Sequence, residues 1–179
     1  MTSSQVSPSG GGGGRGIFLI GFMGSGKSYW GQLWAAKHNR PFFDLDQMIE
    51  EQEGLTVAAF FKKYGEKVFR DKETAILKSF SGKANFIMAC GGGTPCFNGN
   101  IQLMNEMGTS IYLFANAQYL YERVSEEKDK RPLLKDISDN ELLFFIEQKL
   151  KEREPFYQQA KIILPVTVLS AETILTLNL

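Results

Sequence analysis

The chain has 179 residues, of which 43% are hydrophobic and 22% are charged, a composition typical of one soluble globular domain. Lysine plus arginine equals aspartate plus glutamate, with 20 residues of each sign, so the basic surplus common in nucleic-acid-binding proteins is missing. No apolar run approaches the length of a membrane span, and the two cysteines, Cys90 and Cys96, fit neither a disulfide framework nor a zinc site. These totals argue against a nucleic-acid-binding or membrane protein and favour free thiols in a reducing cytosol.

The opening segment, MTSSQVSPSGGGGGRG, is rich in serine and glycine and lacks the apolar stretch of a signal peptide. We expect residues 1–16 to form a flexible tail and residues 17–179 to form a single folded domain. Short apolar runs predict five strands, at residues 17–20, 41–46, 85–90, 110–115 and 160–166. Helical patterns occupy the segments between them, at residues 27–38, 46–53, 56–64, 66–80, 100–107, 117–124 and 140–153, with a short closing helix from Ser170. The charged stretch 125–136 has no clear period and suits a mobile lid.

Apolar strands that alternate with helices are typical of a parallel sheet that is covered by helices on both faces. In such α/β folds, ligands bind beside the carboxyl ends of the strands. The residues that directly follow each predicted strand are therefore the first candidates for a functional site.

The glycines after the first strand, in GFMGSGKS (residues 21–28), fit the pattern G-x-x-x-x-G-K-[ST] at the start of a helix. Glycine lets consecutive backbone N–H groups converge on a phosphate, and the helix N-terminus adds a favourable partial charge. The Lys27 ammonium can reach the β- and γ-phosphates, and the Ser28 hydroxyl can ligate Mg²⁺. The pattern predicts a protein that binds a nucleoside triphosphate with magnesium, but it does not identify what receives the phosphate.

Two aspartates, Asp44 and Asp46, end the second predicted strand in PFFDLD. Side chains two residues apart in a strand point to the same side, so we expect both carboxylates to face the ligand crevice. A P-loop enzyme needs one carboxylate near magnesium and another to orient the attacking hydroxyl or accept its proton. The alternative interpretation is that one aspartate caps the following helix. The third strand ends in FIMACGGG without an acid, which leaves these two aspartates as the best candidates for the metal side.

Glycines and arginines complete the candidate site. Residues 91–93 are all glycine, so their backbone N–H groups are accessible and can donate hydrogen bonds to a small polar substrate or to phosphate. The alternative interpretation is that these glycines only form a flexible turn. Arg70 and Glu73 share a helix face, and Arg131 precedes a proline in the charged stretch. Arg153 lies just before another proline, which we expect to end its helix. Taken singly, Arg70 and Arg153 are equally compatible with solvent-exposed arginines.

Taken together, these segments resemble the shikimate kinase family. The matching pieces are GFMGSGKS, DLD, GEKVFRDKE, CGGG, RPLL and REPFY, in the family's order and roughly its spacing, from about Ile17 to Val166. The P-loop is shared by many enzymes, whereas the combination of the other pieces is far more specific. The resemblance implies a P-loop kinase fold with five parallel strands in the order 2-3-1-4-5, a lid and a helical substrate-binding region. It also implies an enzyme that uses MgATP to phosphorylate the 3-hydroxyl of shikimate, in the pathway to chorismate and the aromatic amino acids.

The resemblance also implies roles for individual residues. Lys27, Asp46 and Arg131 would be catalytic, with Asp46 on the acceptor hydroxyl and Arg131 as the lid arginine that meets the phosphates of ATP. The ATP-binding residues would be Gly21, Gly24, Ser25, Gly26, Lys27, Ser28, Tyr29, Arg123, which lies on adenine, and Arg131. Shikimate would contact Asp46, Phe61, Phe69, Arg70, Gly92, Gly93 and Arg153, with the two arginines on its carboxylate and the two phenylalanines against its ring. Ser28 and Asp44 would lie on the magnesium side.

Two other functions would share part of this pattern. A different small-molecule P-loop kinase, such as a gluconate or nucleoside monophosphate kinase, would have the same nucleotide loop. The two-arginine carboxylate site argues against an acceptor that carries a base and a phosphate. A nucleotide-dependent binding protein that has lost phosphoryl transfer would be expected to lack Asp46 or Arg131, and both are present. We expect a monomeric, cytoplasmic enzyme with no nucleic-acid or membrane partner.

Overall fold

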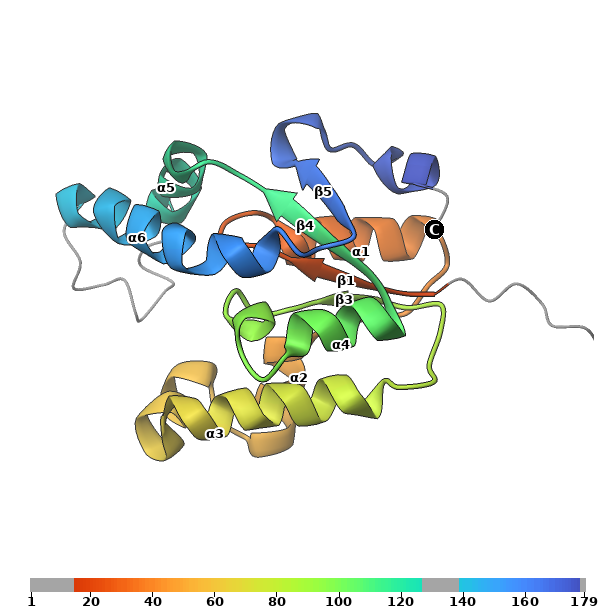
Figure 1. The fold of residues 1–179 in the computed structure, drawn as a ribbon, viewed down its shortest axis with the longest axis horizontal. Coiled ribbons are helices and arrows are strands. Elements are labelled where there is room, and N and C mark those ends of the chain that lie inside the picture. The colour runs from red at the N-terminus through yellow and green to blue at the C-terminus, as the bar shows by residue number, and fades with distance from the viewer. Residues whose placement is uncertain (1–14, 127–138, 178–179) are drawn as a thin grey trace, which may run out of the picture.

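Five short strands form a parallel sheet in the order β2-β3-β1-β4-β5 in the computed structural model, which describes residues 15–126 and 139–177 (Figure 1). The strands are β1 (Gly16–Ile20), β2 (Phe42–Asp44), β3 (Ile87–Ala89), β4 (Gly108–Phe114) and β5 (Ile162–Pro165). Strand β1 is central, and its Ile17 is in register with Ile87 on one side and Thr109 on the other. The predicted fold class and strand order are therefore confirmed.

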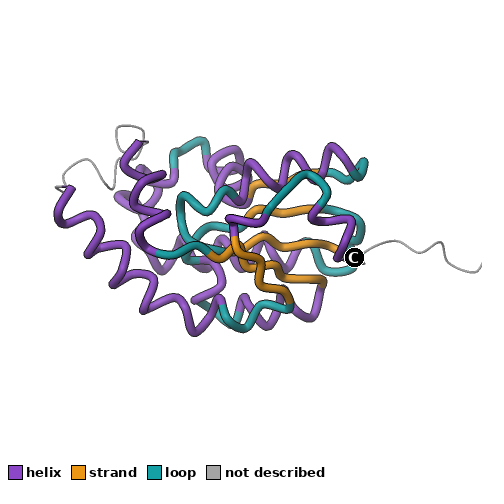
Figure 2. The backbone as a smooth tube through the Cα atoms, turned by 90° about the horizontal axis from the view of Figure 1, so that it is seen from above, coloured by secondary structure: helices purple, strands orange, loops and turns teal. Residues whose placement is uncertain are grey.

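Helices cover both faces of this sheet, as Figure 2 shows from above. They are α1 (Lys27–Lys37), α2 (Leu45–Glu53), α3 (Val57–Ser79), α4 (Asn100–Met107), α5 (Ala117–Glu126) and α6 (Asp139–Tyr157). Side chains in β1 alternate between the two faces, because successive residues of a strand point in opposite directions. Ile17 and Leu19 pack in one buried cluster with α1, α5 and α6, whereas Phe18 and Ile20 pack in another with α2, α3 and α4. The sheet is thus the middle layer between two apolar cores.

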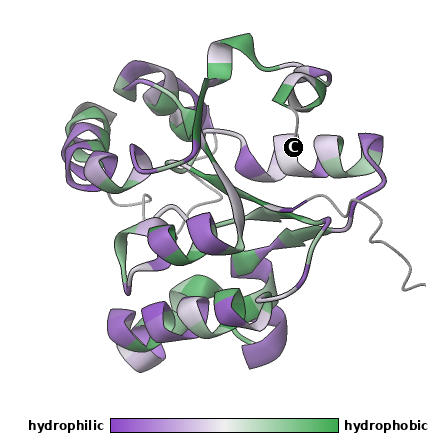
Figure 3. Ribbon diagram, turned by 45° about the vertical axis from the view of Figure 1, so that its right-hand side comes forward, coloured by the Kyte–Doolittle hydropathy of each residue, from purple (hydrophilic) through white to green (hydrophobic). Residues whose placement is uncertain are grey.

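Apolar residues concentrate on the strands and on the inward faces of the helices, while the outer helix faces are hydrophilic (Figure 3). This distribution is the one expected for a sheet that is buried on both faces. No helix within residues 15–126 and 139–177 combines the length and the apolarity that crossing a bilayer would require.

Most element bounds differ from the sequence expectations by one or a few residues, and two of these differences bear on the site. Strand β2 ends at Asp44 rather than Asp46, because the Asp44 side chain accepts hydrogen bonds from the N–H groups of Asp46 and Gln47 and so starts α2. Pro155 does not end α6, which continues to Tyr157 with the proline inside it. The predicted break at Gly65 is confirmed, since its φ of 80° and ψ of 169° interrupt α3.

The predicted tail and lid cannot be followed in full. Residues 1–14 of the tail lie outside the described part of the chain. Of the predicted lid, residues 127–136, including Arg131, also lie outside it. The single-domain division and the lid therefore stay predictions.

Candidate active site

The phosphate loop, residues 21–28, connects β1 to α1 in a conformation that requires glycine. Gly24 and Gly26 have φ values of 83° and 86°, in the left-handed region that side chains with a Cβ disfavour. A Cβ on Gly24 would also lie only 2.9 Å from a methyl carbon of Val124, because α5 packs against the loop. The sequence pattern is therefore explained by both backbone conformation and packing.

Two side chains at the start of α1 are held by specific hydrogen bonds. The Lys27 ammonium donates to the carbonyl oxygens of Gly21 and Phe22, both at 2.9 Å, so it lies over the phosphate loop. The Ser28 hydroxyl donates to Oδ2 of Asp44 at 2.7 Å. An ammonium and a hydroxyl–carboxylate pair are thus brought together at the carboxyl ends of β1 and β2.

Asp44 both caps α2 and faces the start of α1, where the Ser28 hydroxyl lies. One carboxylate oxygen caps α2 by accepting from Asp46 N at 3.1 Å and Gln47 N at 3.3 Å, while the other accepts from Ser28. Asp46, in contrast, lies in the first turn of α2 and not in a strand, so the expected strand alternation is wrong. The two carboxylates nevertheless line the same cavity, because a helix that starts directly after a strand keeps them at one edge of the sheet.

This cavity has a volume of about 370 Å³ and lies at the carboxyl edge of the sheet. Its walls come from the phosphate loop, α1, the end of β2, the end of β3 and α5. The lining residues are Met23, Gly24, Gly26, Lys27, Ser28, Tyr29, Asp44, Asp46, Ala89, Cys90, Gly91, Gly92 and Arg123. Tyr29 and Arg123, to which the resemblance gives a place on the nucleotide side, therefore share one cavity with both aspartates.

Asp46 has an unusual electrostatic environment. Burial raises its pKa from 3.8 to about 6, with further contributions from the negative charges of Glu73 and Asp44, while Lys27 and Arg70 oppose the rise. A Cβ placed on Gly91 would lie 2.9 Å from both Asp46 Oδ1 and Glu73 Oε1. The close approach of the two carboxylates explains their coulombic effect, and a pKa near 6 suits a group that accepts a proton near neutral pH.

Arg70 lies beside these carboxylates and is held by two glutamates on its own helix. Its Nε and Nη2 donate to Glu66 Oε1 at 3.2 and 2.9 Å, and its Nη1 donates to Glu73 Oε2 at 2.8 Å. Glu73 is fully buried and also accepts from the hydroxyl of Thr94. Arginine has five N–H donors, so these contacts leave one donor on Nη1 and one on Nη2. Such a pair matches the two oxygens of a carboxylate.

The glycine loop, residues 91–93, carries no side chains, and this leaves room for the functional side chains that approach its backbone. A Cβ on Gly93 would lie 2.5 Å from Nη2 of Arg70, and one on Gly92 would lie 3.2 Å from Nη1 of Arg153. The same point on Gly92 is 3.5 Å from the carbonyl oxygen of Gly21 in the phosphate loop. Arg70 from α3 and Arg153 from α6 thus meet at one loop that also touches the phosphate loop.

Aromatic rings surround the two arginines. The Arg70 guanidinium lies 5.6 and 5.5 Å from the ring centroids of Phe61 and Phe69, and 4.5 Å from that of Phe97. Arg153 lies 5.4 Å from the ring of Phe22 in the phosphate loop. Phe61 and Phe69 do not line the cavity itself, since Phe69 is buried in the core and Phe61 is half-buried next to it.

Four contributors were missed by the sequence analysis, namely Glu66, Thr94, Phe97 and Tyr157. Glu66 had a usable signal, because it lies four residues before Arg70 on a helix. Thr94 and Phe97 follow the glycine loop and contact Glu73 and Arg70 of α3 only in the folded chain. Tyr157 donates its hydroxyl to the carbonyl of Gly92, 65 residues earlier, and no local pattern predicts that contact.

Comparison with known proteins agrees with this geometry. The family model described as shikimate kinase matches residues 23–176. The shikimate kinase of Bacteroides thetaiotaomicron is 42% identical over 147 residues, which cover 82% of this chain and 84% of that protein. The chain belongs to the shikimate kinase family. It is therefore an enzyme, an ATP-dependent kinase with a hydroxyl of shikimate as acceptor.

Solved structures of shikimate kinases have the same fold. The Bacteroides thetaiotaomicron enzyme superposes with a TM-score of 0.82 at 40% identity, over 85% of this chain and 86% of that one. The shikimate kinase of Acinetobacter baumannii, solved in complex with shikimate, gives a TM-score of 0.79 at 29% identity. The match covers 93% of this chain and 96% of that one. A gluconokinase from Sinorhizobium meliloti gives a TM-score of only 0.51 at 16% identity, over 90% of this chain and 87% of that one. This similarity shows a shared fold alone. The comparisons thus favour shikimate kinase over the predicted alternatives.

Proposed function

We propose that this chain transfers the γ-phosphoryl group of MgATP to the 3-hydroxyl of shikimate, with Asp46 on that hydroxyl and Arg70 and Arg153 on the carboxylate. The observation that carries the proposal is the meeting of both arginines at the glycine loop, directly beside the cavity that holds Lys27 and Asp46. Shikimate is small, anionic and rich in hydroxyls, so a site that binds it needs guanidinium groups for the carboxylate and backbone N–H donors for the hydroxyls.

On the acceptor side, Arg70 offers its two remaining N–H donors, one on each terminal nitrogen, to the carboxylate. Arg153 approaches the same loop from α6 and adds a second cation. The backbone N–H groups of Gly92 and Gly93 supply neutral donors for hydroxyl oxygens. Phe61 and Phe69 lie against the Arg70 guanidinium and hold it at the loop, and because neither lines the cavity, they act on the acceptor through Arg70.

On the nucleotide side, the phosphate loop, Gly21, Gly24, Ser25 and Gly26 included, surrounds the phosphates with backbone N–H groups. Lys27 moves from the loop carbonyls to the β- and γ-phosphates when ATP binds, because a phosphate is the stronger acceptor. Tyr29 and Arg123 lie on the adenosine side of the cavity. The role of Arg131 as the lid cation on the phosphates stays a prediction, since it lies outside the described residues.

The residues around Ser28 fit a magnesium ion. Magnesium prefers hard oxygen ligands and usually keeps several waters while it is bound by one or two carboxylates and the substrate phosphates. Ser28 Oγ and Asp44 Oδ2, 2.7 Å apart, supply such oxygens at the start of α1. These two residues would hold the ion, directly or through water, and its charge would neutralise the phosphates of ATP.

Asp46 performs the proton chemistry. Its half-buried carboxylate orients the acceptor hydroxyl toward the γ-phosphorus and takes the hydroxyl proton during or after transfer. With a pKa of about 6, it is ionised at neutral pH and is a better proton acceptor than an ordinary aspartate. Phosphoryl transfer needs positioning and charge neutralisation more than covalent catalysis, and the remaining residues supply these.

A coupled ADP-release assay tests this proposal. With purified protein, ATP and magnesium, we expect ADP release only when shikimate is added. Gluconate in place of shikimate should give the background rate. Turnover with gluconate, or none with shikimate, would overturn the assignment of the acceptor. A cytoplasmic location and a monomeric state stay predictions from the sequence.

A further inference from the structure

Two buried tyrosines pack against each other beside the glycine loop, Tyr112 from β4 and Tyr157 from the end of α6. Their rings lie 4.9 Å apart with an angle of 38° between the planes. Each hydroxyl makes one hydrogen bond as a donor, Tyr112 to Glu154 Oε2 at 2.8 Å and Tyr157 to the carbonyl oxygen of Gly92 at 2.5 Å. Only the Tyr157 hydroxyl reaches the glycine loop.

Arg153 approaches the same loop residue as the Tyr157 hydroxyl, since a Cβ on Gly92 would lie 3.2 Å from its Nη1. The two residues are four positions apart on α6, one helical turn. Burial raises the pKa of Tyr157, while the charge of Arg153 and a side-chain hydrogen bond from it act in the opposite direction. Tyr157 and Arg153 therefore converge on Gly92, the hydroxyl on its carbonyl oxygen and the guanidinium on its Cα.

The orientation of the Gly92 carbonyl determines where the next N–H group points. In a trans peptide the C=O of one residue and the N–H of the next are antiparallel. Since the Gly92 carbonyl points at Tyr157, the Gly93 N–H points away from it. This N–H has no hydrogen-bond partner among the described residues, whereas the Gly93 carbonyl accepts from Cys96 N at 2.9 Å. One donor of the loop is thus left for a ligand.

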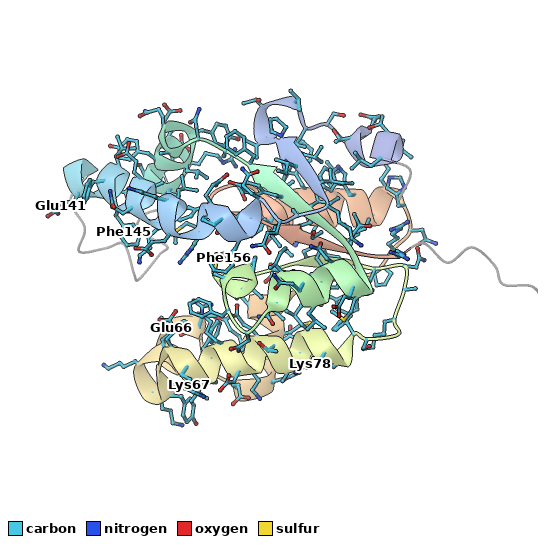
Figure 4. The ribbon with its side chains drawn as sticks, viewed as in Figure 1. Glu66, Lys67, Lys78, Glu141, Phe145 and Phe156 are labelled. Carbon is cyan, nitrogen blue, oxygen red and sulfur yellow. The ribbon has the colours of Figure 1, made fainter. Side chains whose placement is uncertain are left out.

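The end of α6 lies beside the short 3₁₀ turn, Thr94–Cys96, that follows the glycine loop. Figure 4 shows Phe156, the sequence neighbour of Tyr157, at that end of the helix. Because Tyr157 is fully buried, it cannot touch a substrate in the cavity. Any effect on the reaction must act through Gly92 and Arg153.

We propose that Tyr157 is a positioning residue, which fixes the Gly92–Gly93 peptide and Arg153 as one set of donors for the oxygens of the acceptor. This inference rests on the proposed function, since it names a residue that serves the same acceptor site. Removing the hydroxyl leaves the Gly92–Gly93 peptide free to rotate, and it thereby changes the surface against which Arg153 packs at Gly92. Acceptor binding then weakens, while nucleotide binding does not.

The two neighbouring tyrosines provide a matched test, because Tyr157→Phe and Tyr112→Phe each remove one buried hydroxyl. Both variants should melt about 2–4 °C below wild type, as expected for one lost hydrogen bond in a chain of this size. Only Tyr157→Phe should raise the KM for shikimate, by roughly three- to tenfold. Its KM for ATP and its kcat at saturating shikimate should change by less than about twofold.

Equal shikimate KM values in the two variants, or a lower melting temperature without a KM change in Tyr157→Phe, would overturn the proposal. A failure of the proposed function would look different, because the wild-type protein would then not turn over shikimate at all.

Amide hydrogen exchange on the wild-type protein decides the question if Tyr157→Phe does not fold. Shikimate alone, without nucleotide, should slow exchange at the Gly93 amide. Exchange at Gly93 that is unchanged by saturating shikimate would show that this N–H is not a donor to the acceptor, and it would overturn the proposal.

Discussion

The phosphate loop and the acceptor side of the cavity are built in different ways. The phosphate loop is one continuous segment, residues 21–28, whose conformation follows from its own glycines. The acceptor side is assembled from α2, α3, the glycine loop and α6. Hydrogen bonds join the loop and the turn after it to α6 and α3, and side chains of α2, α3 and α6 approach the loop glycines closely. The conformation of the phosphate loop is therefore encoded mainly by a local motif, whereas the acceptor side depends on tertiary contacts.

This difference predicts that a substitution on one side should leave binding on the other side nearly unchanged. Asp46 and Lys27 lie between the two sides, and their replacement should reduce the chemical step. Arg70 lies on the acceptor side alone, and Glu66 supports it. The expected effects decrease in that order.

Asp46→Asn should have the largest effect on catalysis, with kcat reduced on the order of 10²- to 10⁴-fold, because the amide cannot accept the hydroxyl proton. ATP binding, measured by calorimetry without shikimate, should persist. A variant with more than about a tenth of wild-type kcat would exclude Asp46 as the proton acceptor.

The same substitution should raise the stability of the ligand-free protein. The rise in the pKa of Asp46 from 3.8 to about 6 corresponds to at most roughly 3 kcal/mol of destabilisation when the carboxylate is ionised. That cost is present above about pH 6 and disappears as pH falls toward 3.8, because the folded state then takes up the proton first. The melting temperature of Asp46→Asn should therefore exceed that of wild type at pH 8, and the two should converge near pH 4. A constant difference across this range would contradict the pKa assignment.

Lys27→Ala should reduce kcat on the order of 10²- to 10³-fold, since one preorganised cation on the transferring phosphoryl group is lost. Shikimate binding without nucleotide should remain close to wild type. Lys37→Ala, at the other end of α1, is the matched control and should keep full activity. Near wild-type turnover in Lys27→Ala would remove the phosphate loop from the mechanism.

Arg70→Ala and Arg153→Ala should each raise the KM for shikimate roughly ten- to a hundredfold, because a charge-assisted hydrogen bond contributes about 1.5–3 kcal/mol. The affinity for ATP without shikimate should stay nearly unchanged. Lysine at either position should restore only part of the loss, since an ammonium does not reproduce the planar fork. If ATP binding collapsed and shikimate binding survived, both arginines would belong to the nucleotide site.

Glu66→Ala should have the smallest effect, a rise in the shikimate KM of roughly two- to fivefold, because its ion pair with Arg70 is partly exposed. Figure 4 shows Glu66 next to Lys67 on α3. Lys67→Ala removes a comparable pair, with Asp71, and should leave the KM unchanged. A lower KM in Glu66→Ala would mean that Glu66 competes with the substrate for Arg70 and does not support it.

The same contrast explains how much of the site was predictable. The phosphate loop, residues 21–28, follows from glycine spacing, and the alternation of strands and helices follows from short apolar runs, whereas the strand order was implied only by the resemblance to the shikimate kinase family; the fold class and the order are confirmed. The position of Asp46 was predicted for the wrong reason, because the capping preference of Asp44 ended the strand two residues early. Local propensity also failed at Pro155, where α6 packs against the core through Tyr157 and continues past the proline. Tyr157 and Phe97 contact the site across long sequence separations, which spacing alone does not encode.

If the two arginines hold the shikimate carboxylate so that the 3-hydroxyl meets Asp46, the phosphoryl group must be transferred to that hydroxyl alone. NMR of the product made by the wild-type enzyme from ATP and shikimate tests it most directly. We predict a single phosphate ester whose phosphorus couples to the proton on C3. Coupling to the proton on C4 or C5 would show that the acceptor lies in a different orientation, and the absence of any phosphorylated shikimate would contradict the account as a whole.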